Sequence, residues 1–174
     1  MDRLRHLHAE HAVAVRAYAL RRADATTADD SCAEVWAIAW RRIDSVPPDA
    51  LPWLLATTRR VLANERRAQR RRVALLDRLT ASAPTYTPAP VPSGDSPLAA
   101  ALATLRPGDR ETLLLVAWEE LSTVRAAAVL GVSPRTFAVR LHRARKRLAA
   151  ALDTHQASTG RVPTHSERIK EQVP

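Results

Sequence analysis

The stretch "VSPRTFAVRLHRARKRL" (132–148) decides the fold of this chain. It holds six Arg or Lys residues and one His, with no acidic residue. Ser133 can cap a helix, and Pro134 suits the first helical position, where the missing N–H costs nothing. Upstream, Ser122 can cap a shorter helix, and Gly131 can take the left-handed backbone of a tight turn. Two helices joined by a three-residue turn with glycine are typical of a helix-turn-helix.

The second of these helices sorts into two faces at a period of 3.6 residues. One face is apolar, and we expect it to pack on the preceding helices through Phe137, Leu141, Ala144 and Leu148. The outward face mixes cations with small apolar groups: Arg135, Ala138, Val139, His142, Arg143 and Lys146, with Arg140 on its flank. Cations can contact phosphates or guanine edges, and small apolar groups can contact thymine methyls. The pattern therefore predicts a helix that reads the major groove of DNA.

The composition favours a polyanionic partner. The 174 residues carry a formal net charge of +9, almost all of it from Arg. Nucleic acid is the leading candidate, because the basic residues do not lie along one amphipathic helix of the kind that binds a membrane surface. The only cysteine, Cys32, excludes an intrachain disulfide. The polar N-terminus and the short apolar runs predict a cytoplasmic protein without membrane insertion.

The first seventy residues read as three helices, at about 8–22, 27–43 and 52–72. In the second, Asp29 and Asp30 are expected in the first turn and Arg41 and Arg42 in the last, which suits the helix dipole. The segment "DSVPPDALP" (44–52) separates the second and third helices, because its prolines cannot continue a helix. The third helix holds seven Arg residues, and five of them lie in its C-terminal half.

The chain is therefore expected to be all-α, with two small helical domains joined by a flexible linker. A Pro-rich segment, 76–97, is the linker. The helical units before and after it are 1–75 and 98–152, and the last residues, 153–174, read as a polar tail without fixed structure.

The order of these segments resembles that of the extracytoplasmic-function (ECF) group of sigma-70 family sigma factors of RNA polymerase. "ADDSCAEVWAIAWRRID" (28–44) resembles their region 2.2, and "PWLLATTRRVLANERRAQRRR" (52–72) resembles the Trp-Leu helix that follows it. "LATLRPGDRETLLLVAWEELSTVRAAAVLGVSPRTFAVRLHRARKRL" (102–148) resembles region 4. The resemblance spans about 8–152.

The resemblance implies a role for each segment. The family's two all-α domains bind core RNA polymerase, at the β′ clamp and the β flap, and two promoter elements. The polymerase-docking residues would be Asp30, Glu34, Trp40, Arg41 and Arg42. The melted −10 element would contact Ser45, Val46, Asp49, Trp53, Arg59, Arg60 and Asn64, while the −35 element would lie against 135–146. An anti-sigma factor is left open as a further partner.

The sequence departs from the family pattern at three places. Position 125, commonly Glu, is Arg125, so the reciprocal capping box with Ser122 is lost. Position 60, commonly Asn, is Arg60. Ala138 and Val139 replace the usual Lys or Arg and Ser. These departures leave the fold expectation unchanged and alter the groups available to read a promoter.

The sequence gives less support to other functions. His6, His8 and His11 do not share one helical face, so we expect no metal site, and no Gly-rich phosphate loop or nucleophile–base set predicts catalysis or a cofactor. We expect core packing for each of the four tryptophans and for Cys32. Two rivals remain: a helix-turn-helix regulator that binds duplex DNA without replacing a sigma factor, and an Arg-rich protein that binds nucleic acid nonspecifically.

Overall fold

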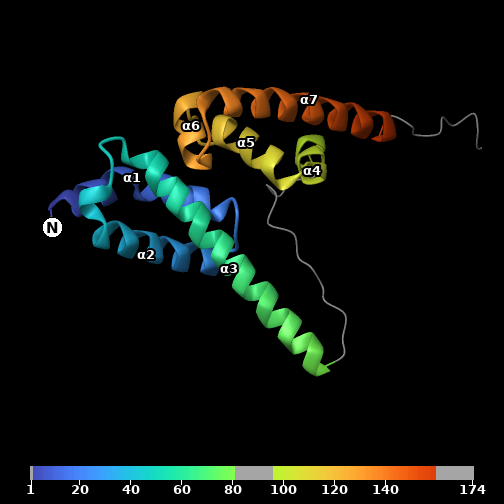
Figure 1. Ribbon diagram of the computed structural model, residues 1–174. Helices are drawn as coiled ribbons and strands as arrows, with labels where there is room; N and C mark the ends of the chain where they lie inside the picture. Colours follow the sequence, from blue (N-terminus) through green and yellow to red (C-terminus); the bar gives the residue numbers. More distant parts are fainter. Residues whose placement is uncertain (1, 81–95, 160–174) are drawn as a thin grey trace, which may run out of the picture.

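The computed structural model describes the backbone of residues 2–80 and 96–159, and the side chains of 2–75 and 96–155. Within these ranges the chain forms seven α-helices and one short 3-10 helix, and it contains no strand. The expected all-α fold of two domains is confirmed (Figure 1). The elements are α1 (Asp2–Leu20), α2 (Ala25–Arg41), η1 (Ile43–Ser45), α3 (Ala50–Thr80), α4 (Pro97–Thr104), α5 (Pro107–Ala117), α6 (Thr123–Leu130) and α7 (Pro134–Thr159).

The first three helices pack on one another in pairs. Their shared core is built from fully buried apolar side chains, among them Val15, Tyr18, Val35 and Leu54. Asp24 caps α2, because its carboxylate accepts hydrogen bonds from the Thr27 amide (3.0 Å) and hydroxyl (2.8 Å). These bonds hold the pKa of Asp24 below its usual value.

The cap at Asp24 corrects the expected start of the second helix. Since α2 begins at Ala25, Asp29 and Asp30 lie in its second turn, not its first. Asp29 instead joins two helices, because Arg16 of α1 donates to both of its carboxylate oxygens (2.8 and 3.2 Å). Only Arg41 has the expected place, in the last turn of the helix.

The last four helices form the second group, in which α4, α5 and α6 all pack on α7. Pro107 begins α5, at a helix position where the missing N–H of proline costs nothing. The end of α4 is closed by Arg110, whose guanidinium donates to the carbonyls of Leu102 (2.8 Å) and Ala103 (2.7 Å). A basic side chain is a common partner for the free carbonyls at a helix C-terminus.

Two helices are longer than expected. α3 continues to Thr80, so residues 76–80 are helical where the linker was expected to begin. α7 continues to Thr159, so residues 153–159 are helical where the tail was expected. The physical reason is the same in both places: neither helix contains a Gly or Pro that would end it in these segments. The rest of the linker, 81–95, and of the tail, 160–174, lies outside the described residues.

The two groups of helices contact each other. α6 packs along α3, and buried apolar residues of both groups belong to one continuous cluster. Figure 1 shows α6 beside the N-terminal part of α3, while the C-terminal part of α3 extends away from both groups. Within the described ranges, no helix combines the length and apolar character needed to cross a membrane.

Candidate nucleic-acid interface

The helix-turn-helix has the geometry that its sequence predicts. The Ser122 hydroxyl accepts a hydrogen bond from the Arg125 amide (3.3 Å), which caps α6. Gly131 follows in the left-handed conformation, with φ of 66° and ψ of 38°. Ser133 then caps α7 by accepting from the Thr136 amide (3.1 Å). Each of these local predictions is confirmed.

The two faces of α7 are also confirmed. Phe137, Leu141 and Ala144 are buried, and Leu148 packs against the same core. Every residue of the expected outward face is exposed, namely Arg135, Ala138, Val139, His142, Arg143 and Lys146, together with Arg140 on the flank. This face carries cations and two small apolar side chains and is open along several turns, so α7 can be laid into a groove of DNA.

A second exposed face lies on α2. All five residues expected to dock the polymerase are exposed: Asp30, Glu34, Trp40, Arg41 and Arg42. Trp40 has 62% of its surface in contact with solvent, which is unusual for an indole outside an interface. Asp30 and Glu34 line a polar cleft between α2 and α3, which Glu65 of α3 also lines.

The four tryptophans do not behave alike. Trp36 and Trp53 pack against the core, as expected. The expectation is wrong for Trp40, and for Trp118, which is 39% exposed. Ala39, the residue before Trp40, is fully buried, so at this level another side chain faces the core. Cys32 is only partly buried, and that burial raises the pKa of its thiol.

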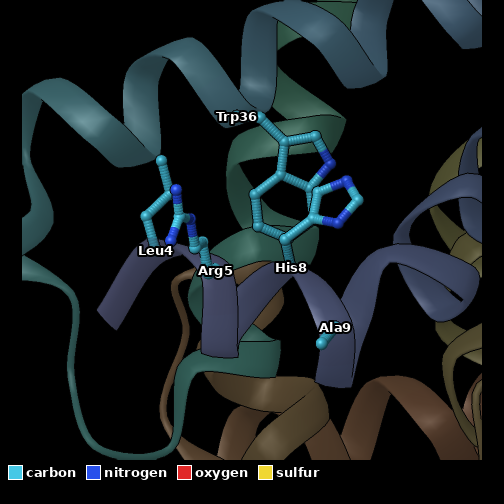
Figure 2. Close-up of a pocket in the computed structure, with 5 residues that line it drawn as sticks. All are labelled: Leu4, Arg5, His8, Ala9 and Trp36. Carbon is cyan, nitrogen blue, oxygen red and sulfur yellow. The ribbon is translucent and has the colours of Figure 1, made fainter. Parts of the chain in front are cut away.

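A shallow groove of about 290 Å³ lies between α1 and α2 (Figure 2). Leu4, Arg5, His8 and Ala9 of α1 and Trp36 of α2 line it. Figure 2 shows the His8 ring against the Trp36 indole, and the two ring centres are 4.8 Å apart. Within the part of the chain described, no group of three or more His, Cys, Asp or Glu side chains is placed to hold a metal ion.

The segment expected to capture the −10 element is more ordered than a simple loop. Ile43–Ser45 form a 3-10 turn, and α3 begins at Ala50, so Pro52 lies in its first turn. Val46 is buried, and its carbonyl accepts a hydrogen bond from Arg3. Its side chain therefore anchors the segment to the core in this structure.

The other expected −10 residues differ in exposure. Ser45, Asp49, Arg59, Arg60 and Asn64 are exposed, while Trp53 is half-buried. Asn64 accepts a hydrogen bond from Arg67, one turn further along α3. Four of these exposed side chains are therefore left at the surface, those of Ser45, Arg59, Arg60 and Asn64. The fifth, the Asp49 carboxylate, is already paired.

The partner of Asp49 comes from the other group of helices. Arg125 of α6 donates to both oxygens of the Asp49 carboxylate, with distances of 2.9 and 2.6 Å. Arg125 is the position at which the sequence departs from the family by losing the capping box. The side chain that no longer caps α6 instead binds the segment before α3.

Sequence reasoning missed a buried ionic cluster between the two groups, which we call the Arg22 cluster: Tyr18, Arg21, Arg22, Glu111 and Glu119. Arg22 donates to both oxygens of Glu111 (2.9 and 3.1 Å) and to Glu119 (3.0 Å). The Tyr18 hydroxyl donates to Glu111 (2.7 Å), and Arg21 also donates to Glu119.

The Arg22 cluster is well shielded from water. The side chains of Arg22 and Glu119 are 7% and 4% exposed, and the Arg22 guanidinium lies 3.4 Å from the centre of the Tyr18 ring. Burial, and then the neighbouring Glu111 carboxylate, raise the pKa of Tyr18 well above its usual value, so the phenol stays a neutral donor. No sequence pattern could have found these pairs, because their members lie far apart in the chain.

Comparisons with known proteins agree with this geometry. The family described as "Sigma-70, region 4" matches residues 96–148, which include the helix-turn-helix. No curated protein matches the sequence.

Two solved structures are similar over most of the chain. One is the sigma factor RpoE in complex with the anti-sigma factor NepR from Bartonella quintana, at 25% identity and a TM-score of 0.66, covering 88% of this chain and 98% of that one. The other is CnrH in complex with the cytosolic domain of CnrY, at 28% identity and a TM-score of 0.57, covering 87% of this chain and 88% of that one.

The helix-turn-helix therefore lies within residues that match region 4 of the sigma-70 family. Most of the chain is similar in fold to a solved sigma factor and to CnrH.

Proposed function

We propose that this chain is a sigma factor of the extracytoplasmic-function group of the sigma-70 family. In this proposal it binds core RNA polymerase through α2, reads a −35 element with α7, and captures a melted −10 element with the segment before α3 and the first half of that helix. The observation that carries the proposal is the separation of three exposed surfaces on a two-domain fold. Each surface holds the residue types that its task needs.

The outward face of α7 supports the −35 assignment. His142 and Arg143 lie one turn beyond Ala138 and Val139, and all four are exposed. A guanidinium in this position can donate two hydrogen bonds to a guanine edge, while a small apolar side chain fits against a thymine methyl. Arg140 lies on the flank, where it would meet phosphates and contribute affinity without sequence preference.

The surface of α3 supports the −10 assignment. Base capture needs a pocket for one unstacked base and cations for the neighbouring phosphates. Pro47 and Pro48 stiffen the exposed segment before α3, which lowers the entropy cost of closing around a base. Arg59 and Arg60 are exposed further along the same helix and supply the charge.

The exposed face of α2 supports polymerase docking. Asp30, Glu34 and Arg41 are spaced so that they share one side of the helix, and the exposed Trp40 lies next to Arg41. Aromatic and Arg residues are enriched in the centres of protein interfaces, so Trp40 is the expected anchor. The β′ clamp is the proposed partner of this face, and the β flap is the proposed partner of the second domain.

We further propose an anti-sigma factor as a regulatory partner. One of the two similar structures is a sigma factor in complex with an anti-sigma factor. The other is CnrH in complex with the cytosolic domain of CnrY. Binding of such a protein would compete with core polymerase for the sigma factor.

Run-off transcription tests the proposed function directly. Sigma-free bacterial core polymerase is given a promoter library with and without this protein. We expect transcripts that depend on the protein and share sequence around −35 and −10. Specific duplex binding by the isolated protein, with no protein-dependent transcript, would favour the helix-turn-helix regulator instead.

A further inference from the structure

We propose that Arg3, in the first turn of α1, positions the capturing segment, by which we mean residues 44–49 between α2 and α3. Arg3 acts on this segment through the Val46 carbonyl and does not itself contact DNA. The inference rests on the proposed capture of the −10 element by this segment. It adds a positioning residue from α1, a helix with no part in the proposed DNA-binding surfaces.

The contact joins two parts of the first domain that are distant in the sequence. The guanidinium of Arg3 donates a hydrogen bond to the carbonyl oxygen of Val46, which lies 43 positions further along the chain. Figure 1 shows the start of α1 at the same end of the first three helices as the connection from α2 to α3. The bond therefore ties the beginning of α1 to the capturing segment.

The backbone of the capturing segment has few hydrogen-bond donors with which to hold its own place. Pro47 and Pro48 carry no N–H, so neither can donate a backbone hydrogen bond. The amides of Ser45 and Val46 donate to carbonyls of the turn that directly precedes them. The bond from Arg3 therefore supports the segment from outside that turn.

The Val46 carbonyl is a sensitive place for such a bond, because it belongs to the planar peptide group that joins Val46 to Pro47. The Val46 side chain is buried, at 3% exposure, so the core holds one side of this residue and Arg3 holds the other. Each proline also fixes its own φ. The orientation of this one peptide group therefore sets the direction in which the exposed residues 47–49 leave the core.

A segment held in one orientation serves base capture in two ways. Less conformational entropy is lost when the segment closes around an unstacked base, so capture is tighter. The contacts that distinguish one base from another also keep a fixed geometry, whereas a loose segment can adapt to the wrong base. Loss of the Arg3 bond should therefore lower both the affinity for the −10 strand and the discrimination between bases.

A direct phosphate contact by Arg3 is the rival explanation, because its side chain is exposed and a guanidinium has further N–H donors to offer. The two roles differ in their dependence on salt. Removal of a phosphate contact reduces the salt slope of DNA binding by about 1 and weakens all sequences alike. Removal of a positioning contact leaves the salt slope unchanged and lowers the discrimination between sequences.

Three variants of the full chain separate these roles. Arg3→Met keeps most of the length of the side chain and removes its donors and its charge, while Arg3→Lys keeps a charged donor. Arg5→Met is the matched control, because it removes the same charge two positions away, where a helical side chain faces another direction. Figure 2 shows Arg5 at the groove between α1 and α2.

The first measurement uses each variant bound to core polymerase and a promoter selected by run-off transcription. Fluorescence anisotropy at several salt concentrations gives the affinity for single strands with a matched or a mismatched −10 element. For Arg3→Met we expect the ratio of these affinities to fall about two- to tenfold, the effect of one hydrogen bond, at an unchanged salt slope. Arg3→Lys should recover part of the ratio, and Arg5→Met should equal the wild type.

Three outcomes would overturn the inference. One is equal discrimination by the wild type and Arg3→Met. Another is a smaller salt slope with the same discrimination, which would make Arg3 a phosphate contact. The third is an equal loss of discrimination in Arg5→Met, which would make the effect one of net charge.

Hydrogen exchange of the free chain tests the contact without any promoter. The amides of Val46 and Asp49 should exchange faster in Arg3→Met than in the wild type, because local opening of the segment costs less. Unchanged exchange at both amides would overturn the inference, as would unfolding of the whole first domain, which would make the bond a general stabilising contact. If the wild type supports no transcription, the proposed function fails, and exchange still decides whether Arg3 holds the segment.

Discussion

The outer face of α7 and the surface of α3 are both basic, yet the sequence predicts them unequally. On α7, the cap, the turn, the buried side and the exposed side all follow from residues within about twenty positions. By contrast, the segment before α3 that is proposed to capture DNA is paired to Arg125, and α3 itself packs on α6 of the other group of helices. The first surface is set by local rules, whereas the second depends on contacts between distant parts of the chain.

The largest expected effect is on stability, at the core against which α7 packs. Phe137 is fully buried, so Phe137→Ala should lower the free energy of unfolding by about 3–5 kcal/mol. Chemical denaturation followed by circular dichroism measures this change. Val139→Ala is the control on the exposed side of the same helix and should change stability by less than about 0.5 kcal/mol. Equal losses would mean that the two faces of α7 are not distinct.

The next largest effect is expected on the face of α2 that is proposed to dock the polymerase. Glu34→Lys combined with Arg41→Glu reverses two exposed charges, and like charges brought together across an interface cost several kcal/mol. We expect at least about a tenfold loss of affinity for core polymerase, which is about 1.4 kcal/mol. Fluorescence anisotropy of labelled protein measures the affinity. Unchanged binding, with normal helicity, would move the docking surface elsewhere.

The third largest effect is expected on DNA affinity, where two arginines of α7 should differ. Arg143→Ala should cost about 1–3 kcal/mol at a cognate base, whereas Arg140→Ala should weaken all sequences alike and reduce the salt slope by about 1. Affinities for cognate and scrambled −35 sequences at several salt concentrations separate the two roles. If Arg143→Ala weakens both sequences equally, Arg143 is a phosphate contact.

The smallest effect is expected for the exposed pair between the domains. Arg125→Ala removes both hydrogen bonds to Asp49 but should change the free energy of unfolding by only about 0–1 kcal/mol, because exposed ion pairs are weak. Thermal unfolding measures it, with Arg125→Lys as the conservative control. A loss well above this range would show that the pair stabilises the contact between domains by more than its exposure suggests.

The sequence predicted the fold class, the helix-turn-helix and the sorting of α7 because each follows from periodicity or from a capping residue. It placed the ends of α3 and α7 too early, since a polar composition does not end a helix that lacks Gly or Pro. It placed the start of α2 too late, although Asp24 is a capping residue that could have been recognised.

The contacts of the Arg22 cluster could not be predicted. Arg21 and Arg22 read in the sequence as solvated charges at a helix end, and Glu111 reads as an ordinary helix residue. Their partners lie 89 to 98 positions away, so only the folded chain brings them together. The same holds for Arg125, whose departure from the family pattern was visible but whose partner was not.

We propose that α7 reads the −35 element and that the segment before α3 captures the −10 element. Promoter opening tests this assignment most directly. Residues 45–50 are replaced by a Gly-Ser segment, and permanganate reactivity of thymines near the start site is measured on duplex and pre-melted templates with core polymerase. We predict that the variant still binds the polymerase and the −35 element, fails to open the duplex, and regains part of its transcription on the pre-melted template. Equal opening of the duplex by the wild type and the variant would contradict the assignment and place strand capture on Trp53 and the Arg-rich part of α3.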